Sequence, residues 1–141
     1  MGSPVAPNVV LDTNVIVSAV LCQGGKPDKI VEWVVGKKLN LFYSKEIILE
    51  YRTVLHRPKF GFDPHVLALL LESITHVGHI INPVPSTFPL TDESDRIFYD
   101  VAKASSSYLI TGNSRHYPAE AFITTPADFI KLMSKQGFIG Q

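Results

Sequence analysis

The chain has 141 residues, with thirteen basic and thirteen acidic side chains and five histidines beside them. Hydrophobic residues make up 45% and charged residues 18%, so the composition excludes intrinsic disorder for most of the chain. The length is typical of one domain, and the zero formal charge excludes a strongly basic clamp for nucleic acid.

The cysteine content and the apolar runs predict the cellular compartment of the protein. Cys22 is the sole cysteine, which excludes an intrachain disulfide and favours a reducing compartment, so we expect a cytoplasmic protein. Its apolar neighbourhood predicts that Cys22 packs as a small core residue. The apolar stretch 9–22 is interrupted at Asp12, which argues against a membrane span or a secretion signal. Met1-Gly2-Ser3 resembles a cloning remnant, and we expect a tail over 1–7 and a single domain over 8–141.

The first predicted element is a strand at 8–11, because this run is apolar without alternation and stops at Asp12. Pro27 is placed to start a helix, and Ser44 is placed to cap one that ends before Pro58. In order, this half of the chain is predicted to hold a strand at 8–11, helices at 14–21 and 27–35, a strand at 39–43 and a helix at 44–57.

The second half repeats the alternation of helix and strand. Asp63-Pro64 opens a helix whose apolar residues, Val66 among them, recur at helical spacing through Thr75. Strands that alternate with helices argue for a parallel sheet covered on both faces. The remaining predictions are a strand at 77–81, a proline-containing loop at 82–89, a helix at 95–105, strands at 108–110 and 122–123, and a helix from Pro126.

Acidic and amide side chains are predicted to meet at one edge of this sheet. Ligands of open parallel sheets bind at the carboxyl ends of the strands, where Asp12 and Asn113 fall and which the helix start at Asp95 should face. An acid that ends a buried strand must be hydrogen-bonded, paired or metal-bound, because burying it alone is costly. Oxygen ligands without a Cys or His cluster favour Mg²⁺ or Mn²⁺ over zinc.

Other acids have structural interpretations. Asp92 is suited to cap a helix N-terminus, where its charge also favours the helix dipole. Asp100 lies four residues after Arg96, which predicts a surface ion pair between them.

Four segments together resemble the PIN-domain ribonuclease family. The first acid is followed by Thr13 and Asn14, the second segment leads to Glu50, the third contains Asp95, and the fourth ends in Gly112-Asn113. The segments, within a resemblance that spans about 8–132, are Val9-Val10-Leu11-Asp12-Thr13-Asn14-Val15, Ser44-Lys45-Glu46-Ile47-Ile48-Leu49-Glu50-Tyr51, Asp92-Glu93-Ser94-Asp95-Arg96-Ile97-Phe98-Tyr99-Asp100-Val101-Ala102 and Tyr108-Leu109-Ile110-Thr111-Gly112-Asn113.

The resemblance implies a three-layer α/β/α sandwich around a central parallel sheet of about five strands. It also implies a Mg²⁺- or Mn²⁺-dependent endoribonuclease that hydrolyses RNA phosphodiester bonds. The implied catalytic and metal-binding acids are Asp12, Glu50 and Asp95. The supporting residues that it implies are Asn14, Thr111, Asn113 and Asp92.

The sequence is most similar to the subgroup of toxins in bacterial and archaeal type II toxin–antitoxin pairs (VapC-like). This likeness implies a small antitoxin protein as partner and a homodimer. We expect RNA contacts from Arg96, Arg115 and His116, within a wider basic set whose alternative interpretation is ordinary solvated surface. The rest of that set is Lys45, Arg52, Arg57 and Lys59.

Asn113 departs from the family pattern, because many members carry a fourth acid there. A neutral amide makes one metal ion easier to support than two. It also keeps open a second class of function, a catalytically weak or inactive PIN-like module that binds RNA or a partner. A haloacid-dehalogenase-like enzyme would require a second Asp at position 14, where this chain has Asn14.

Overall fold

Five short strands form a parallel sheet in the order β3-β2-β1-β4-β5, in a computed structural model that describes residues 6–137. The central strand, β1, is fully buried from Val9 to Leu11, which is why its sequence is apolar on both faces. The predicted parallel sheet is therefore confirmed. The strands are β1 (Asn8–Leu11), β2 (Asn40–Tyr43), β3 (His79–Ile80), β4 (Tyr108–Ile110) and β5 (Ile123–Thr124).

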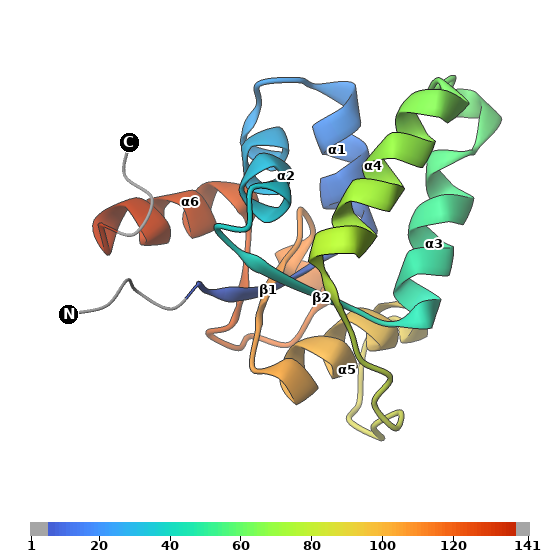
Figure 1. Cartoon of the computed structure of the whole chain (residues 1–141). Helices are drawn as coiled ribbons and strands as arrows, with labels where there is room; N and C mark the ends of the chain where they lie inside the picture. Colours follow the sequence, from blue (N-terminus) through green and yellow to red (C-terminus); the bar gives the residue numbers. More distant parts are fainter. Residues whose placement is uncertain (1–5, 138–141) are drawn as a thin grey trace.

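Helices cover both faces of the sheet and complete the α/β/α fold (Figure 1). Helix α5 packs against β1, β2 and β4 on one side, and α1, α2, α4 and α6 lie on the other. The helices are α1 (Thr13–Leu21), α2 (Lys26–Val35), α3 (Lys45–Leu55), α4 (Pro64–Val77), α5 (Arg96–Ser105) and α6 (Pro126–Lys135). Three 3₁₀ turns join them, η1 (Pro58–Phe60), η2 (Glu93–Asp95) and η3 (Ser114–His116).

Capping residues and prolines predicted the helix starts to within one residue. The Ser44 hydroxyl accepts a hydrogen bond from the Ile47 N–H at 3.2 Å, which is the cap predicted for α3. Proline stands in the first turn of α2, α4 and α6, where its missing N–H costs nothing. Within residues 6–137 no helix is long and apolar enough to cross a membrane.

One packing prediction is wrong. Cys22 is exposed, because α1 ends at Leu21 and the thiol lies in the turn before α2 rather than in the core. In the predicted helix α4 the buried face carries Leu67 and Leu71, and the neighbouring Val66 is exposed because it points about 100° away from that face.

The predicted ion pair between Asp100 and Arg96 is also wrong. Asp100 is only 7% exposed and accepts hydrogen bonds from the backbone N–H of Ser86 at 2.9 Å and from its hydroxyl at 2.6 Å. Arg96 instead donates to Glu93 through Nε at 2.8 Å. The loop at 82–89 thus folds back over α5 and supplies the partner that local spacing could not reveal.

Part of the expected N-terminal tail is attached to the sheet. The Pro7 carbonyl accepts from the Asn40 N–H at 2.8 Å, and the Ala6 carbonyl accepts from the Asn40 side chain at 3.2 Å. The other tail residues, 1–5, lie outside the described residues, as do residues 138–141. The predicted extent of the domain, 8–141, stays a prediction.

Candidate functional site

Asp12 lies between the two central strands at the carboxyl edge of the sheet. In the parallel register Leu11 pairs with Ile110, so the residues that follow them, Asp12 and Thr111, become neighbours. The Asp12 N–H donates to the Ile110 carbonyl at 2.9 Å, and its side chain is only 8% exposed. The site is therefore anchored to the most buried part of the fold.

Two hydroxyl groups hold the Asp12 carboxylate, and both donate to the same oxygen. Thr111 Oγ1 lies 2.8 Å from Asp12 Oδ2, and the Tyr117 hydroxyl lies 3.2 Å from it. Burial raises the pKa of Asp12 above its usual range, although these hydrogen bonds and nearby backbone N–H groups act to lower it. The effect of burial is larger than that of the hydrogen bonds, so the negative charge of the Asp12 carboxylate is only partly stabilised.

Asp95 is the second acid of the site. Burial raises the pKa of Asp95 to about 6, with further increases from the negative charges of Asp12 and Asp92; His116 and the Tyr117 hydroxyl act in the opposite direction. These influences place Asp95 beside Asp12, at the end of η2. Among the described residues, Asp95 Oδ2 is the buried side-chain oxygen or nitrogen that lacks a hydrogen-bond partner.

The donor set fits a divalent cation. The charge of Asp12 raises the pKa of Asp95, so a positive charge beside the two carboxylates would stabilise them, and an unpartnered buried oxygen is available as a ligand. Oxygen-only donors are the type that Mg²⁺ and Mn²⁺ prefer.

Glu50 contacts Thr13, the residue next to Asp12. Thr13 Oγ1 approaches Glu50 Oε2 at 3.5 Å, and Thr13 follows Asp12 directly at the start of α1. Within residues 6–137 the acids, histidines and cysteine do not form a ready-made group of three metal ligands. The structure thus brings Asp12 and Asp95 together, while the shared role predicted for Glu50 stays a prediction.

The predicted supporting residues organise the loop after β4. Asn14 Oδ1 accepts from the Gly112 N–H at 2.9 Å, and Thr111 Oγ1 accepts from the Asn113 N–H at 3.0 Å. These bonds tie the loop to α1 and orient the Thr111 hydroxyl toward Asp12. The Asn113 side chain is exposed at this edge.

Asp92 has the capping geometry that the sequence indicated. Its Oδ1 accepts from the Ser94 N–H at 2.9 Å and from the Ser94 hydroxyl at 2.8 Å, at the start of η2. These hydrogen bonds lower the pKa of Asp92, so it stays ionised and adds negative charge beside Asp95.

Tyr117 is the site residue that sequence reasoning missed. It follows η3 and is buried, with its hydroxyl directed at the two acids. A single tyrosine five residues beyond Gly112 gives no periodic or motif signal. Only its position soon after β4, the strand that precedes Thr111, could have suggested it.

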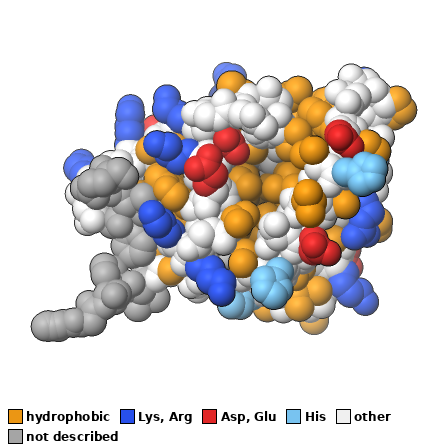
Figure 2. Space-filling view, turned by 45° about the horizontal axis from the view of Figure 1, so that its top comes forward, with side chains coloured by type: hydrophobic (Ala, Val, Ile, Leu, Met, Phe, Trp, Pro, Cys, Tyr) orange, Lys and Arg blue, Asp and Glu red, His pale blue; other side chains and the backbone are white. Residues whose placement is uncertain are grey.

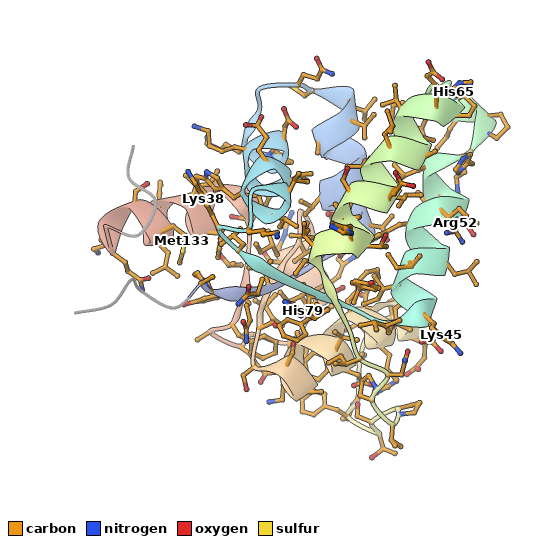
Figure 3. The ribbon with its side chains drawn as sticks, viewed as in Figure 1. Lys38, Lys45, Arg52, His65, His79 and Met133 are labelled. Carbon is orange, nitrogen blue, oxygen red and sulfur yellow. The ribbon has the colours of Figure 1, made fainter. Side chains whose placement is uncertain are left out.

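The basic residues divide into two kinds. The Arg96 side chain is only 15% exposed and donates to Glu93 and to the Ser86 carbonyl, so its guanidinium serves the fold. Arg115 and His116 are exposed in η3, and His116 lies close enough to lower the pKa of Asp92 and Asp95. Lys45 and Arg52 point outward from α3 (Figure 3).

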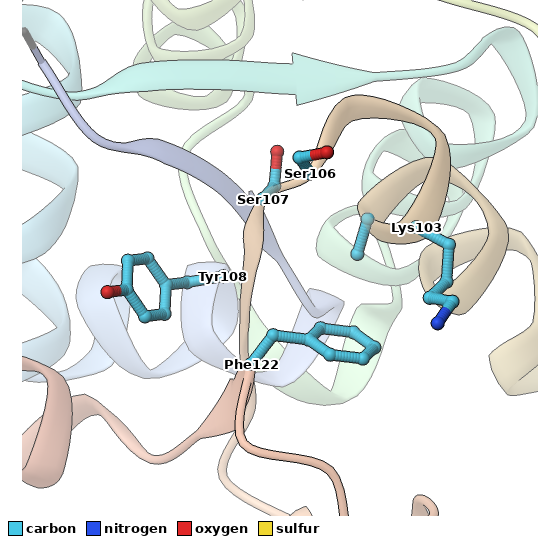
Figure 4. A pocket seen from close by; sticks show the side chains of 6 residues that line it. Lys103, Ser106, Ser107, Tyr108 and Phe122 are labelled. Atoms are coloured by element: carbon cyan, nitrogen blue, oxygen red, sulfur yellow. The ribbon is translucent and has the colours of Figure 1, made fainter.

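A cavity of about 400 Å³ lies at the opposite end of β4 (Figure 4). Tyr108, the first residue of that strand, and Phe122 line it, with the Lys103 ammonium 5.5 Å from the Phe122 ring centre. Because β4 separates this cavity from Thr111 and Asp12, it is not part of the acidic site.

Comparisons with known proteins relate the chain to a domain family and to an archaeal protein. A family model described as the PIN domain matches residues 8–115, which include every acid of the site. An uncharacterized protein of Methanocaldococcus jannaschii is 33% identical over 109 residues, covering 74% of this chain and 70% of that protein.

Proposed function

This chain belongs to the PIN domain family, and on that premise we propose that it is a Mg²⁺- or Mn²⁺-dependent endoribonuclease. The observation that carries the proposal is the pair of partly compensated carboxylates, Asp12 and Asp95, with one buried oxygen left without a partner. Groups kept at such electrostatic cost are concentrated at functional sites.

In this proposal Asp12 and Asp95 bind the cation directly, and Glu50 supplies a third carboxylate from α3. A bound Mg²⁺ or Mn²⁺ would supply positive charge at the scissile phosphodiester and favour deprotonation of a water near neutral pH. Thr111 and Tyr117 keep the Asp12 carboxylate in one orientation through their hydrogen bonds to Oδ2.

The exposed residues around the acids are placed to handle the substrate. Asn113 orients a water at the edge of the site with its amide group. Arg115 and His116 bind phosphate groups of the RNA backbone, because both are exposed on η3 beside the acids. Arg96 is left out of this role, since Glu93 and Ser86 already engage its guanidinium.

The direct test is cleavage of a panel of single-stranded and structured RNAs by the purified protein with Mn²⁺, with Mg²⁺ and in EDTA. We expect internal cuts with either ion and none in EDTA. Asp12→Asn should lose this cleavage. Asp100→Asn is its matched control, because Asp100 is a buried acid of the same region that hydrogen-bonds to Ser86 instead of facing the site. Cleavage that persists in EDTA would contradict the proposal.

A second candidate function follows from Asn113, whose neutral side chain removes one negative charge from the expected site. In that case the protein binds RNA or a partner protein without cutting. Retention of RNA in a filter-binding assay, with no cleavage under any metal condition, would favour this alternative.

We also propose that the protein is the toxin of a toxin–antitoxin pair and acts as a homodimer. Leu49 on α3 and Leu69 on α4 are exposed apolar side chains suited to such contacts, and Figure 2 shows hydrophobic side chains across one face with charged ones around them. Growth arrest on expression, relieved by a small protein encoded beside it, would support the toxin role. A monomer in solution at micromolar concentration would contradict the dimer.

A further inference from the structure

Tyr117 reaches the acidic site from outside the segments that carry the acids. Its backbone follows η3, its side chain is only 6% exposed, and its hydroxyl donates to Asp12 across a separation of 105 residues. A buried tyrosine hydroxyl usually finds a hydrogen-bond partner, but a backbone carbonyl or a water would meet that need equally well. Here the partner is a carboxylate of the candidate metal site.

The two hydroxyls on Asp12 have a geometric consequence. Thr111 and Tyr117 both donate to Oδ2, and among the described residues Asp12 makes no side-chain capping bond to α1. Rotation of the carboxylate about its Cβ–Cγ bond would break both bonds. The other oxygen, Oδ1, is therefore held in a fixed position, and neither of the two hydroxyls donates to it.

The hydroxyl of Tyr117 remains a donor under ordinary conditions. Burial raises the pKa of Tyr117 well above that of free tyrosine, and the negative charges of Asp12 and Asp95 raise it further. The hydroxyl is thus a donor to Asp12 in the folded protein.

We propose that Tyr117 is a positioning residue for the cation site: its hydroxyl fixes Asp12 Oδ2 so that Oδ1 is presented to the ion. This inference rests on the metal binding of the proposed function, but not on RNA cleavage. Outer partners of metal ligands typically contribute 10- to 100-fold to metal affinity, because they orient the ligand before the ion arrives.

Tyr117→Phe removes the hydroxyl and keeps the buried ring. Tyr51→Phe is the matched control, because the Tyr51 hydroxyl is also buried and donates at 2.6 Å to the carbonyl of Leu11, the residue before Asp12. Both variants lose one buried hydrogen bond near the same strand end, but only Tyr117→Phe releases a carboxylate.

The measurement is the binding of Mn²⁺ alone, followed by the decrease of the electron paramagnetic resonance signal of the free ion. We expect Tyr117→Phe to weaken Mn²⁺ binding by about 10-fold or more and Tyr51→Phe to change it by less than about twofold. In a cleavage assay, saturating Mn²⁺ should recover most of the activity of Tyr117→Phe, because the ligands themselves remain.

The outcomes separate this inference from the proposed function. If the parental protein binds Mn²⁺ and Tyr117→Phe binds it equally well, the positioning role is wrong and the ribonuclease proposal stands. Equal losses in both variants would also overturn it, because the effect would then be a general loss of stability. If Mn²⁺ binding falls as expected but no RNA is cut, positioning stands and the ribonuclease activity fails. A parental protein that binds no Mn²⁺ overturns both.

Discussion

Asp95 and Asp100 lie five residues apart, one at the end of η2 and the other in the middle of α5, and they differ in how their carboxylates are satisfied. Asp100 is almost fully buried, and each of its oxygens accepts a hydrogen bond from Ser86. Asp95 is half-buried, yet it has a buried oxygen without a partner and a raised pKa. Burial alone therefore does not distinguish the two acids, whereas the satisfaction of their hydrogen bonds does.

The difference has an energetic basis. A buried carboxylate that accepts well-aligned hydrogen bonds is stabilised in its charged form, and it holds the loop at 82–89 against α5. A carboxylate beside two other negative charges destabilises the metal-free protein. Under the proposed function a bound cation would compensate for this cost, in keeping with the usual trade-off between stability and activity.

The largest expected effect is on RNA cleavage, when the charge of Asp12 is removed. Asp12→Asn keeps the shape of the side chain and removes its charge, so RNA cleavage should fall on the order of 10²–10³-fold. The circular dichroism spectrum should stay unchanged, because Asn can still accept from Thr111. Cleavage by this variant at the parental rate would contradict both the site and its proposed chemistry.

The difference between Asp95 and Asp100 predicts opposite effects on stability when each is changed to Asn. Asp100→Asn places an amide donor against the two donors of Ser86 and should lower the free energy of unfolding by about 1–3 kcal/mol. Asp95→Asn removes a repelled charge and should leave that free energy unchanged or raise it. Urea denaturation of both variants in EDTA checks the sign, and equal destabilisation would remove the distinction drawn between the two acids.

The pKa of Asp95 predicts a pH dependence for the metal-free protein. Because its pKa is raised from 3.8 in the unfolded chain to about 6 in the folded one, the folded state holds the proton more tightly. The stabilising contribution is fully present below pH 3.8 and is lost as the pH rises through 6. After allowance for solvent screening, we expect a decrease on the order of 1 kcal/mol.

The raised pKa of Asp12 adds a contribution in the same direction. The decrease should be smaller in Asp95→Asn, and denaturation in EDTA at pH 5 and pH 7 measures it. Added Mn²⁺ should stabilise the parental protein more at pH 7 than at pH 5, because ligation requires ionised carboxylates. An unfolding free energy that rises equally with pH in both proteins would contradict this account.

The smallest effect is expected at Asn113. Asn113→Asp adds a carboxylate at the exposed edge of the site and should retain cleavage or raise it up to about fivefold, which corresponds to about 1 kcal/mol. Metal-free stability should fall slightly, because another negative charge joins Asp12 and Asp95. Single-turnover cleavage rates measure the gain, and loss of cleavage would show that the amide itself is required.

The order of strands and helices was encoded locally. The apolar run of β1, the Ser44 cap and the prolines at helix starts act within a few residues, so periodicity and capping rules were sufficient to predict them. The position of Asp12 at a strand end followed from the same local rule. Strand bounds shifted by one or two residues, most clearly at the sheet edge, where the strand predicted at 77–81 is reduced to the two residues of β3 and the one predicted at 122–123 lies at β5.

Only the tertiary structure decided which partners those acids have. Thr111 and Tyr117 reach Asp12 across separations of 99 and 105 residues, because β1 and β4 pair in a parallel sheet. Asp100 binds Ser86 rather than Arg96, since the loop at 82–89 returns over α5. Such contacts depend on strand register and on loop path, and neither leaves a periodic trace in the sequence, which is why Asp95 and Asp100 looked alike until the chain was folded.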